Sequence, residues 1–241
     1  MSIKALFSIP NLLTLANLFL GCMAIHFLFH DEIVWVLVCI SLALLADFLD
    51  GYAARALGVA SPIGKELDSL ADMVSFGVVP GIMMYILMTE SAESSENFLA
   101  AWNGLPFLGF IITLFSALRL AIFNLDETQS DHFKGLATPA NTIFFLGVFF
   151  IAKEDMFGLR YYVMNPVFLL ILTLLFSYLL ISPIKMFKPK PAIRWKEGYW
   201  RQTILLIVAI PALIFLKEAA LAFLVLLYIL LSLSRQLETG R

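Results

Sequence analysis

Four aspartates in an otherwise apolar stretch are the residues of this sequence best suited to chemistry: Asp47, Asp50, Asp68 and Asp72. Placing an ionised group in a membrane segment costs roughly 2.5–3.5 kcal/mol on insertion scales, so four together imply a compensating cation and a function. Carboxylate oxygens suit Mg²⁺ or Mn²⁺, and no His or Cys that would favour zinc lies between the first and the last aspartate. The cluster therefore predicts divalent-metal chemistry.

The residues around the first two aspartates fit a phosphate-ester substrate. Gly51 and Ala54 each follow an aspartate, Asp47 and Asp50, by about one helical turn, so the helix face that carries the carboxylates has little side-chain bulk. Arg55 adds a planar cation with several donors for phosphate oxygens. Two metal ions bridging a diphosphate would stabilise both the attacking and the leaving oxygen, and we expect a reaction of this class.

Two helices must bring the carboxylates to one membrane surface. The first pair lies near the end of the apolar segment 33–57, and the second pair lies one turn apart at the start of the next apolar segment. The connection ends with Ser61 and Pro62, which is typical of a helix N-cap followed by the first helical residue. An ion or proton relay, the alternative for carboxylates in a membrane segment, belongs nearer the bilayer midplane.

The composition predicts an all-α integral membrane protein. The chain is 61% hydrophobic and 14% charged, with a mean hydropathy of +0.92, which excludes an ordinary soluble domain. Backbone groups in lipid must pair within their own segment, so the apolar runs are helices. We expect spans at 9–29, 33–57, 66–89, 103–124, 138–152, 161–182, 200–216 and 219–234. Because Pro211 interrupts the seventh, six core spans plus a shallow C-terminal hairpin remain the alternative to eight.

Charge placement predicts that both termini are cytoplasmic. With this topology, all but Lys153, Arg160 and Lys217 of the 16 basic residues face the cytoplasm, as the positive-inside rule requires. The predicted organisation is a core over residues 1–182, a basic cytoplasmic loop over 183–202, and a C-terminal helical hairpin and tail over 203–241. The loop carries Trp195, Tyr199 and Trp200, which would suit anchoring on anionic lipid, but a solvated positive-inside loop is the favoured account.

The spacing of the cluster resembles a family signature. The pattern D-x2-D-G-x2-A-R-x8-G-x3-D-x3-D, complete here from Asp47 to Asp72, is similar to that of the CDP-alcohol phosphatidyltransferases. The resemblance implies a bundle of six core spans, often a homodimer, with a site open to the cytoplasm where an alcohol displaces CMP from a CDP-alcohol lipid. It also implies that the four aspartates bind two divalent ions, that Asp72 is the general base, and that Gly51, Arg55 and Ser61 line the nucleotide-diphosphate site.

The first span carries a second element of the resemblance. Asn11, Thr14 and Asn17 recur at steps of three along an apolar helix, so they face protein or water rather than lipid. Ordinary hydrogen bonding between helices would explain this stripe. In the family, a similar P-N-x-x-T element closes over the CDP headgroup, which implies that role for Asn11 and Thr14. The candidate CDP-diacylglycerol contacts are therefore Asn11, Thr14, Gly51, Ala54, Arg55, Ser61 and Gly64.

Flanking segments resemble the phosphatidylserine synthase branch of the family. They are V-S-F-G-V-V-P after Asp72, A-L-R-L-A-I-F-N ending at Asn124, and F-K-G-L-A-T-P ending at Pro139. Ile122 and Ala137 depart from that branch, where Arg and Pro are frequent. We expect Arg119 to hold the serine carboxylate, with Ser75 and Asn124 orienting the substrate. Anchoring to a lipid phosphate is the alternative role for Arg119.

The sequence thus predicts a bacterial or archaeal cytoplasmic-membrane enzyme that transfers a phosphatidyl group from CDP-diacylglycerol to L-serine, with its active site facing the cytoplasm. Its expected cofactors are two Mg²⁺ or Mn²⁺ ions, and its expected partners are membrane lipids and a second copy of itself, with no nucleic acid. A sister enzyme using glycerol 3-phosphate or an inositol phosphate is the first alternative. An ion-coupled transporter is the alternative of a different class, and a purely structural membrane protein leaves the aspartate motif unexplained.

Overall fold

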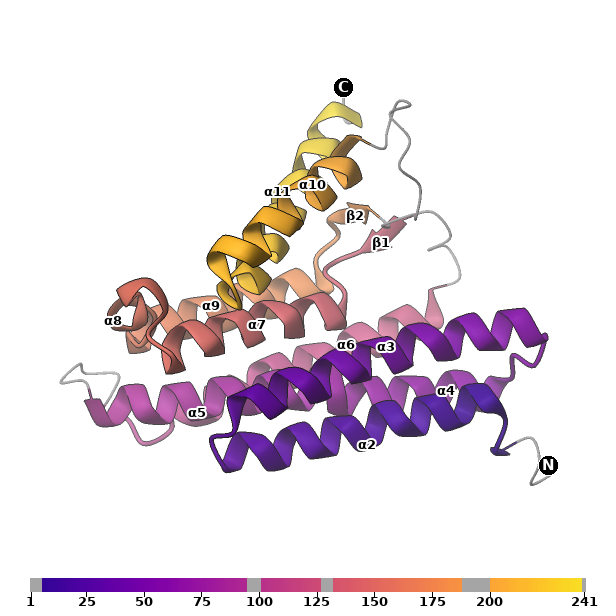
Figure 1. Cartoon of the computed structure of the whole chain (residues 1–241), viewed down its shortest axis with the longest axis horizontal. Coiled ribbons are helices and arrows are strands. Elements are labelled where there is room, and N and C mark those ends of the chain that lie inside the picture. Colours follow the sequence, from indigo (N-terminus) through magenta and orange to yellow (C-terminus); the bar gives the residue numbers. More distant parts are fainter. Residues whose placement is uncertain (1–5, 95–100, 127–131, 188–199, 240–241) are drawn as a thin grey trace.

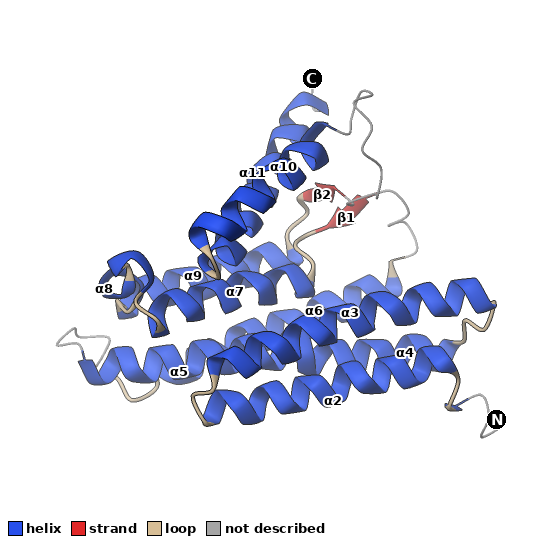
Figure 2. Ribbon diagram, in the orientation of Figure 1, coloured by secondary structure: helices blue, strands red, loops and turns tan. Residues whose placement is uncertain are grey.

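The computed structural model describes residues 6–94, 101–126, 132–187 and 200–239 and is built almost entirely of helices (Figures 1 and 2). The longer elements are α2 (Ile9–Phe29), α3 (Ile33–Leu57), α4 (Pro62–Asp72), α5 (Val79–Ser94), α6 (Ile111–Leu125), α7 (Thr138–Lys153), α9 (Pro166–Ile181), α10 (Trp200–Leu216) and α11 (Ala219–Thr239). The short ones are 3-10 turns at Leu105–Phe110 and Met156–Gly158, α8 (Arg160–Val163), and strands β1 (His132–Lys134) and β2 (Lys185–Phe187). The all-α expectation is confirmed, apart from this two-stranded ribbon.

Four helical segments are long and apolar enough to cross a membrane: Ile9–Phe29, Ile33–Leu57, Pro62–Ser94 and Leu105–Leu125. Four shorter apolar helices follow, at Thr138–Lys153, Pro166–Ile181, Trp200–Leu216 and Ala219–Ser234. Each predicted span thus overlaps an apolar helix, although not always with the same bounds. Their lengths alone leave the number of membrane crossings a prediction.

Local sequence signals explain where these helices begin. Ser61 accepts a hydrogen bond from the Gly64 amide at 3.2 Å, and Pro62 follows at the first helical position, so the predicted N-cap of α4 is confirmed. The predicted span 161–182 is wrong as a single helix. It breaks before Pro166, where the Asn165 side chain caps α9 by accepting hydrogen bonds from the amides of Val167 and Phe168.

A π-helical segment, Met73–Val78, follows Asp72 directly and joins α4 to α5. A π-turn leaves carbonyl groups without their usual partners inside the helix, and neighbouring hydroxyl groups satisfy two of them. Thr113 donates to the Gly77 carbonyl and Thr142 to the Phe76 carbonyl, each at 3.0 Å. The irregular turn beside the aspartates is therefore held by side chains from α6 and α7.

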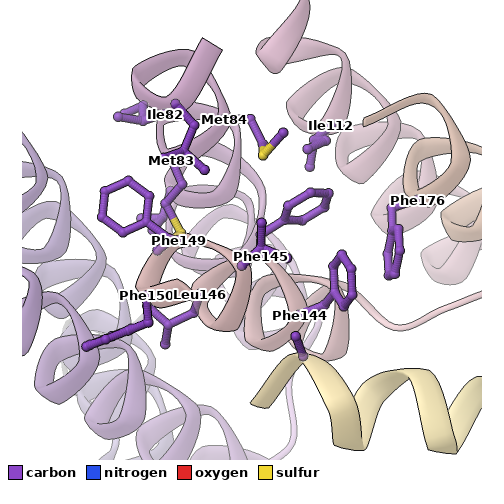
Figure 3. Close-up of a cluster of buried hydrophobic side chains, with 14 of the residues drawn as sticks. Ile82, Met83, Met84, Ile112, Phe144, Phe145, Leu146, Phe149, Phe150 and Phe176 are labelled. Atoms are coloured by element: carbon purple, nitrogen blue, oxygen red, sulfur yellow. The ribbon is translucent and has the colours of Figure 1, made fainter. Parts of the chain in front are cut away.

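Helices α2 to α6 run nearly side by side, α7 and α9 lie over them, and the α10–α11 hairpin leans away at a steep angle (Figure 1). The apolar core centres on the phenylalanines of α7, which meet side chains of α5, α6 and α9 (Figure 3). Phe144 stacks on Phe176 with ring centroids 3.7 Å apart. This packing fixes α7, whose first residues border the site described below.

Candidate active site

The four predicted aspartates come together at the end of the bundle where α3 passes to α4. Asp47 and Asp50 project from the last turns of α3, and Asp68 projects from α4. Carboxylate oxygens of these three residues all lie within 4.8 Å of one another. Asp72, one turn further along α4, lines the same cavity as the other three. The sequence prediction that two antiparallel helices bring both pairs together is confirmed.

The first span contributes hydrogen bonds to this cluster. The Thr14 hydroxyl donates to Asp50 Oδ2 at 2.5 Å, and Asn17 Nδ2 donates to Asp72 Oδ1 at 3.1 Å. Both donors are buried, so each fixes the position of a carboxylate without much exchange with solvent. The polar stripe of the first span therefore makes hydrogen bonds between helices and also takes part in the site.

The acidic cluster lacks an internal counter-ion. Within the part of the chain that the structure describes, none of the four aspartates forms an ion pair, and Asp68 Oδ1 is buried with no hydrogen-bond partner. Carboxylates this close repel one another, and burial strengthens the repulsion. An all-oxygen donor set with an unsatisfied buried oxygen fits a hard divalent cation such as Mg²⁺ or Mn²⁺.

A cavity of about 230 Å³ opens beside Asp50 and Asp68. It is lined by all seven predicted CDP-diacylglycerol contacts, Asn11, Thr14, Gly51, Ala54, Arg55, Ser61 and Gly64. Two glycines allow the close packing there. A Cβ on Gly51 would lie 3.3 Å from Arg55 Nη1, and one on Gly64 would lie 3.1 Å from Asn11 Oδ1. The two glycines thus leave room for the Arg55 guanidinium and the Asn11 amide beside this cavity.

A second cavity, of about 430 Å³, meets the first along Asp50, Gly51, Arg55 and Asp68. It also contains Asp47, Asp72 and Arg119, and apolar side chains of α3 and α6 border it. The carboxylate cluster therefore stands between two connected compartments. A diphosphate bound across the shared residues would be open to attack from the side of Asp72.

Of the three predicted serine contacts, only Arg119 lines this second cavity. Its side chain is buried, its Nε donates to the Leu136 carbonyl at 3.2 Å, and its Nη1 has no hydrogen-bond partner. Nε is thus held by the backbone, whereas the buried Nη1 keeps an unused capacity to donate a hydrogen bond.

The structure places the other two predicted serine contacts elsewhere. The Ser75 hydroxyl is fully buried and donates to the Asn17 carbonyl at 2.9 Å, where Gly21 leaves room for it. The Asn124 amide donates to Ser69 Oγ at 2.8 Å. Neither residue borders either cavity. The sequence could not show this, because the π-helix turns Ser75 toward α2 rather than toward Asp72's cavity.

Two residues at the site were not among the predicted contacts. Asn17 binds Asp72, and its place as the third member of the polar stripe was the available signal. Lys65 borders the smaller cavity and donates from Nζ to the Asn124 carbonyl at 2.7 Å. Its position directly after Gly64, inside the aspartate motif, could have identified it.

Most of the predicted basic loop, 183–202, lies outside the described residues. The part left out is 188–199, which contains Trp195 and Tyr199. Trp200 begins α10, and Arg201 Cζ lies 4.4 Å from the centroid of the Trp200 ring. The lipid-anchoring role of the loop stays a prediction.

Comparison with known proteins agrees with this geometry. A model of the CDP-alcohol phosphatidyltransferase family matches residues 7–179, a range that contains the whole site. The chain belongs to this family. It is therefore an integral membrane protein of the transferase class, and the expectation drawn from the aspartate signature is confirmed.

Three relatives carry the same printed name, CDP-diacylglycerol–serine O-phosphatidyltransferase. The protein from Bacillus subtilis is 33% identical over 198 residues, which cover 80% of this chain and 98% of that protein. The one from Methanocaldococcus jannaschii is 32% identical over 184 residues, which cover 76% of each. The one from Helicobacter pylori is 33% identical over 145 residues, which cover 59% of this chain and 57% of the relative.

Proposed function

We propose that this protein transfers the phosphatidyl group of CDP-diacylglycerol to the hydroxyl of L-serine, giving phosphatidylserine and CMP. One observation carries the proposal: Asp72 and buried Arg119 line one cavity, which shares Asp50 and Asp68 with the predicted nucleotide cavity. A base for the hydroxyl and a cation for the carboxylate of serine thus lie in the same compartment. The names of the relatives support the same acceptor.

We assign two divalent cations, Mg²⁺ or Mn²⁺, to Asp47, Asp50, Asp68 and Asp72. When bound, the ions would neutralise charge on the diphosphate and on the departing CMP. The support is the donor set itself, three carboxylates within 4.8 Å with a fourth in the same cavity. Thr14 and Asn17 would hold two of these ligands in place, as second-layer hydrogen bonds do at metal sites.

The reaction is a single displacement. Asp72 accepts the proton of the serine hydroxyl, and that oxygen forms a bond to the phosphorus that bears diacylglycerol. The bond from this phosphorus to the CMP oxygen breaks, and CMP leaves with the electron pair. Asn17 holds the Asp72 carboxylate so that its free oxygen faces the incoming hydroxyl. Arg55 and Lys65, which border the smaller cavity, would bind the phosphate oxygens.

We place the protein in a bacterial or archaeal cytoplasmic membrane as a homodimer of eight-span chains, with both termini and the site on the cytoplasmic side. Its core would be 1–182, followed by the loop 183–202 and the hairpin and tail 203–241. The placement of basic residues supports this orientation. Of the three outer bases of that scheme, Lys153 ends α7, Arg160 begins α8 and Lys217 lies between α10 and α11.

The decisive experiment offers purified protein CDP-diacylglycerol and Mn²⁺ or Mg²⁺ with L-serine, glycerol 3-phosphate or inositol phosphate in separate reactions and measures CMP release. We expect release with L-serine alone. Release with a phosphorylated alcohol alone would replace serine by a sister acceptor and remove the role of Arg119. Ion transport in vesicles without CMP release from folded protein would favour the transporter alternative.

A further inference from the structure

The C-terminal hairpin, α10 and α11, lies beyond the residues that the family model matches, yet it contacts strand β2. From β2 the chain contacts lead to Arg119, which lines the second cavity, called here the acceptor cavity. Helix α11 packs closely on α7, because Gly147 has no side chain and any Cβ there would collide with Ala222. Further along α11, the Tyr228 hydroxyl donates to the Phe187 carbonyl in β2 at 3.0 Å, and its ring meets the Phe187 ring at 4.8 Å. The hairpin thus holds strand β2.

Strand β2 in turn holds the chain that leads to Leu136. It pairs antiparallel with β1, with Lys185 opposite Lys134. Beyond the pairing, the Gly135 amide donates to the Ile184 carbonyl at 2.8 Å. Gly135 has a φ of +77° and lies against the carbonyl of Leu180, so only glycine fits this turn. Any displacement of β2 is therefore transmitted to the residue that follows.

Leu136 is the residue that orients the guanidinium of Arg119. The Leu136 amide donates to the Leu179 carbonyl at 2.9 Å, and its own carbonyl accepts from Arg119 Nε at 3.2 Å. With Nε held, the planar fork has one orientation, in which Nη1 is buried and unpaired. The acceptor cavity borders both Arg119 and the start of α7 at Thr138.

We propose that Tyr228 is a positioning residue for the acceptor alcohol, acting through β2, Leu136 and Arg119 to set the guanidinium for the acceptor's carboxylate. The inference rests on the proposed function for the identity of that acceptor. It gives the C-terminal hairpin a role in acceptor binding, although it contributes no residue to either cavity. The predicted CDP-diacylglycerol contacts line the smaller cavity, which Arg119 does not border, so we expect CDP-diacylglycerol binding to be unaffected by this path.

The test is a double-mutant cycle in the full-length protein. Tyr228→Phe removes only the hydroxyl and should raise the KM for L-serine about fivefold, the effect of one lost hydrogen bond, with kcat and the KM for CDP-diacylglycerol unchanged. In the Arg119→Lys background, Tyr228→Phe should raise the serine KM no further, because both changes act on the same contact. Tyr178→Phe, at an exposed tyrosine of α9, is the matched control.

Each outcome decides the inference. An unchanged serine KM in Tyr228→Phe, equal increases in both backgrounds, or equal changes for both substrates would overturn it. Ala222→Val, which would push α11 off Gly147, provides a second variant, and its serine KM should rise if the path is correct. If the wild-type protein releases CMP only with another alcohol, the proposed function fails, and the same cycle run with that alcohol still decides whether Tyr228 positions the acceptor.

Discussion

The two ends of the helical bundle both gather acidic side chains but treat them in opposite ways. At the end where α2 turns into α3, Lys153 of α7 bridges Asp31 at 2.7 Å and Glu90 at 2.5 Å. At the other end, four aspartates share a cavity, and within the described residues none of them has an ion-pair partner.

The difference separates a structural cluster from a functional one. Lys153 forms an ion pair with each of its two acidic neighbours and ties together three parts of the chain, so both carboxylates have a partner within the protein. The aspartate cluster has four carboxylates in a cavity that it shares with Arg55 and Arg119, so its negative charge is only partly compensated, and such groups mark functional sites. If this distinction is correct, substitutions in the Lys153 cluster lower stability, and substitutions in the aspartate cluster lower activity.

Asp68→Asn should have the largest effect. Removing a central metal ligand should lower kcat about a thousandfold, because charge stabilisation by a bound metal is worth several kcal/mol. Mn²⁺ binding measured by calorimetry should weaken in parallel. Glu93→Gln, an exposed acid at the opposite end, is the control and should keep both properties. Undiminished Mn²⁺ affinity in Asp68→Asn would show that the cluster is not the metal site.

Asn17→Ala should lower kcat by about 10- to 100-fold, the usual cost of losing a hydrogen bond that orients a functional carboxylate. The variant leaves every aspartate in place, so it tests whether Asp72 must be held by α2. Steady-state CMP release measures the effect, with Asn103→Ala at an exposed site as the control. A kcat equal to that of the wild type would remove Asn17 from the account.

Arg119→Lys should raise the KM for L-serine about tenfold and leave the KM for CDP-diacylglycerol unchanged. A lysine keeps the charge but loses the planar fork that can bind Leu136 and a carboxylate together. The control is Arg160→Lys, at an exposed arginine that begins α8. Equal increases in both KM values would instead indicate the alternative role of Arg119 in anchoring lipid phosphate.

Lys153→Met should have the smallest effect on catalysis and a measurable one on folding. The side chain is 11% exposed and binds two carboxylates, so its loss should lower the free energy of unfolding by about 1–2 kcal/mol. The kcat of folded protein should not change. Thermal unfolding in detergent would measure the difference, with Lys217→Met at an exposed turn as the control. A loss of activity without a loss of stability would contradict the division between the two ends.

Much of this arrangement could be predicted from the sequence because its signals are local. Apolar length predicted helices at 9–29 and 33–57 with the bounds that the structure has, and Ser61 with Pro62 predicted where α4 begins. Helical spacing alone brought the aspartates to one surface. The family resemblance, rather than spacing, implied most of the seven predicted CDP-diacylglycerol contacts, and all seven are among the residues that line the smaller cavity.

What could not be predicted depends on packing between distant segments. Helical periodicity assumes a regular turn, so the π-helix after Asp72, and with it the direction of Ser75, had no sequence signal. The pairing of β1 with β2, two strands of three residues each, depends on how α7, α9 and α11 are placed. The contact between Asn17 and Asp72 also depends on the relative position of two helices, although the stripe that contains Asn17 was visible.

The most direct test of the central claim is the incorporation of labelled L-serine into lipid by purified protein supplied with CDP-diacylglycerol and Mn²⁺, compared between the wild type and Asp72→Asn. We predict phosphatidylserine formation by the wild type that stops when the metal is chelated. We predict at least a hundredfold less product from Asp72→Asn, in line with the loss of a general base. Comparable lipid labelling by Asp72→Asn, or labelling by the wild type that persists after chelation, would contradict the account.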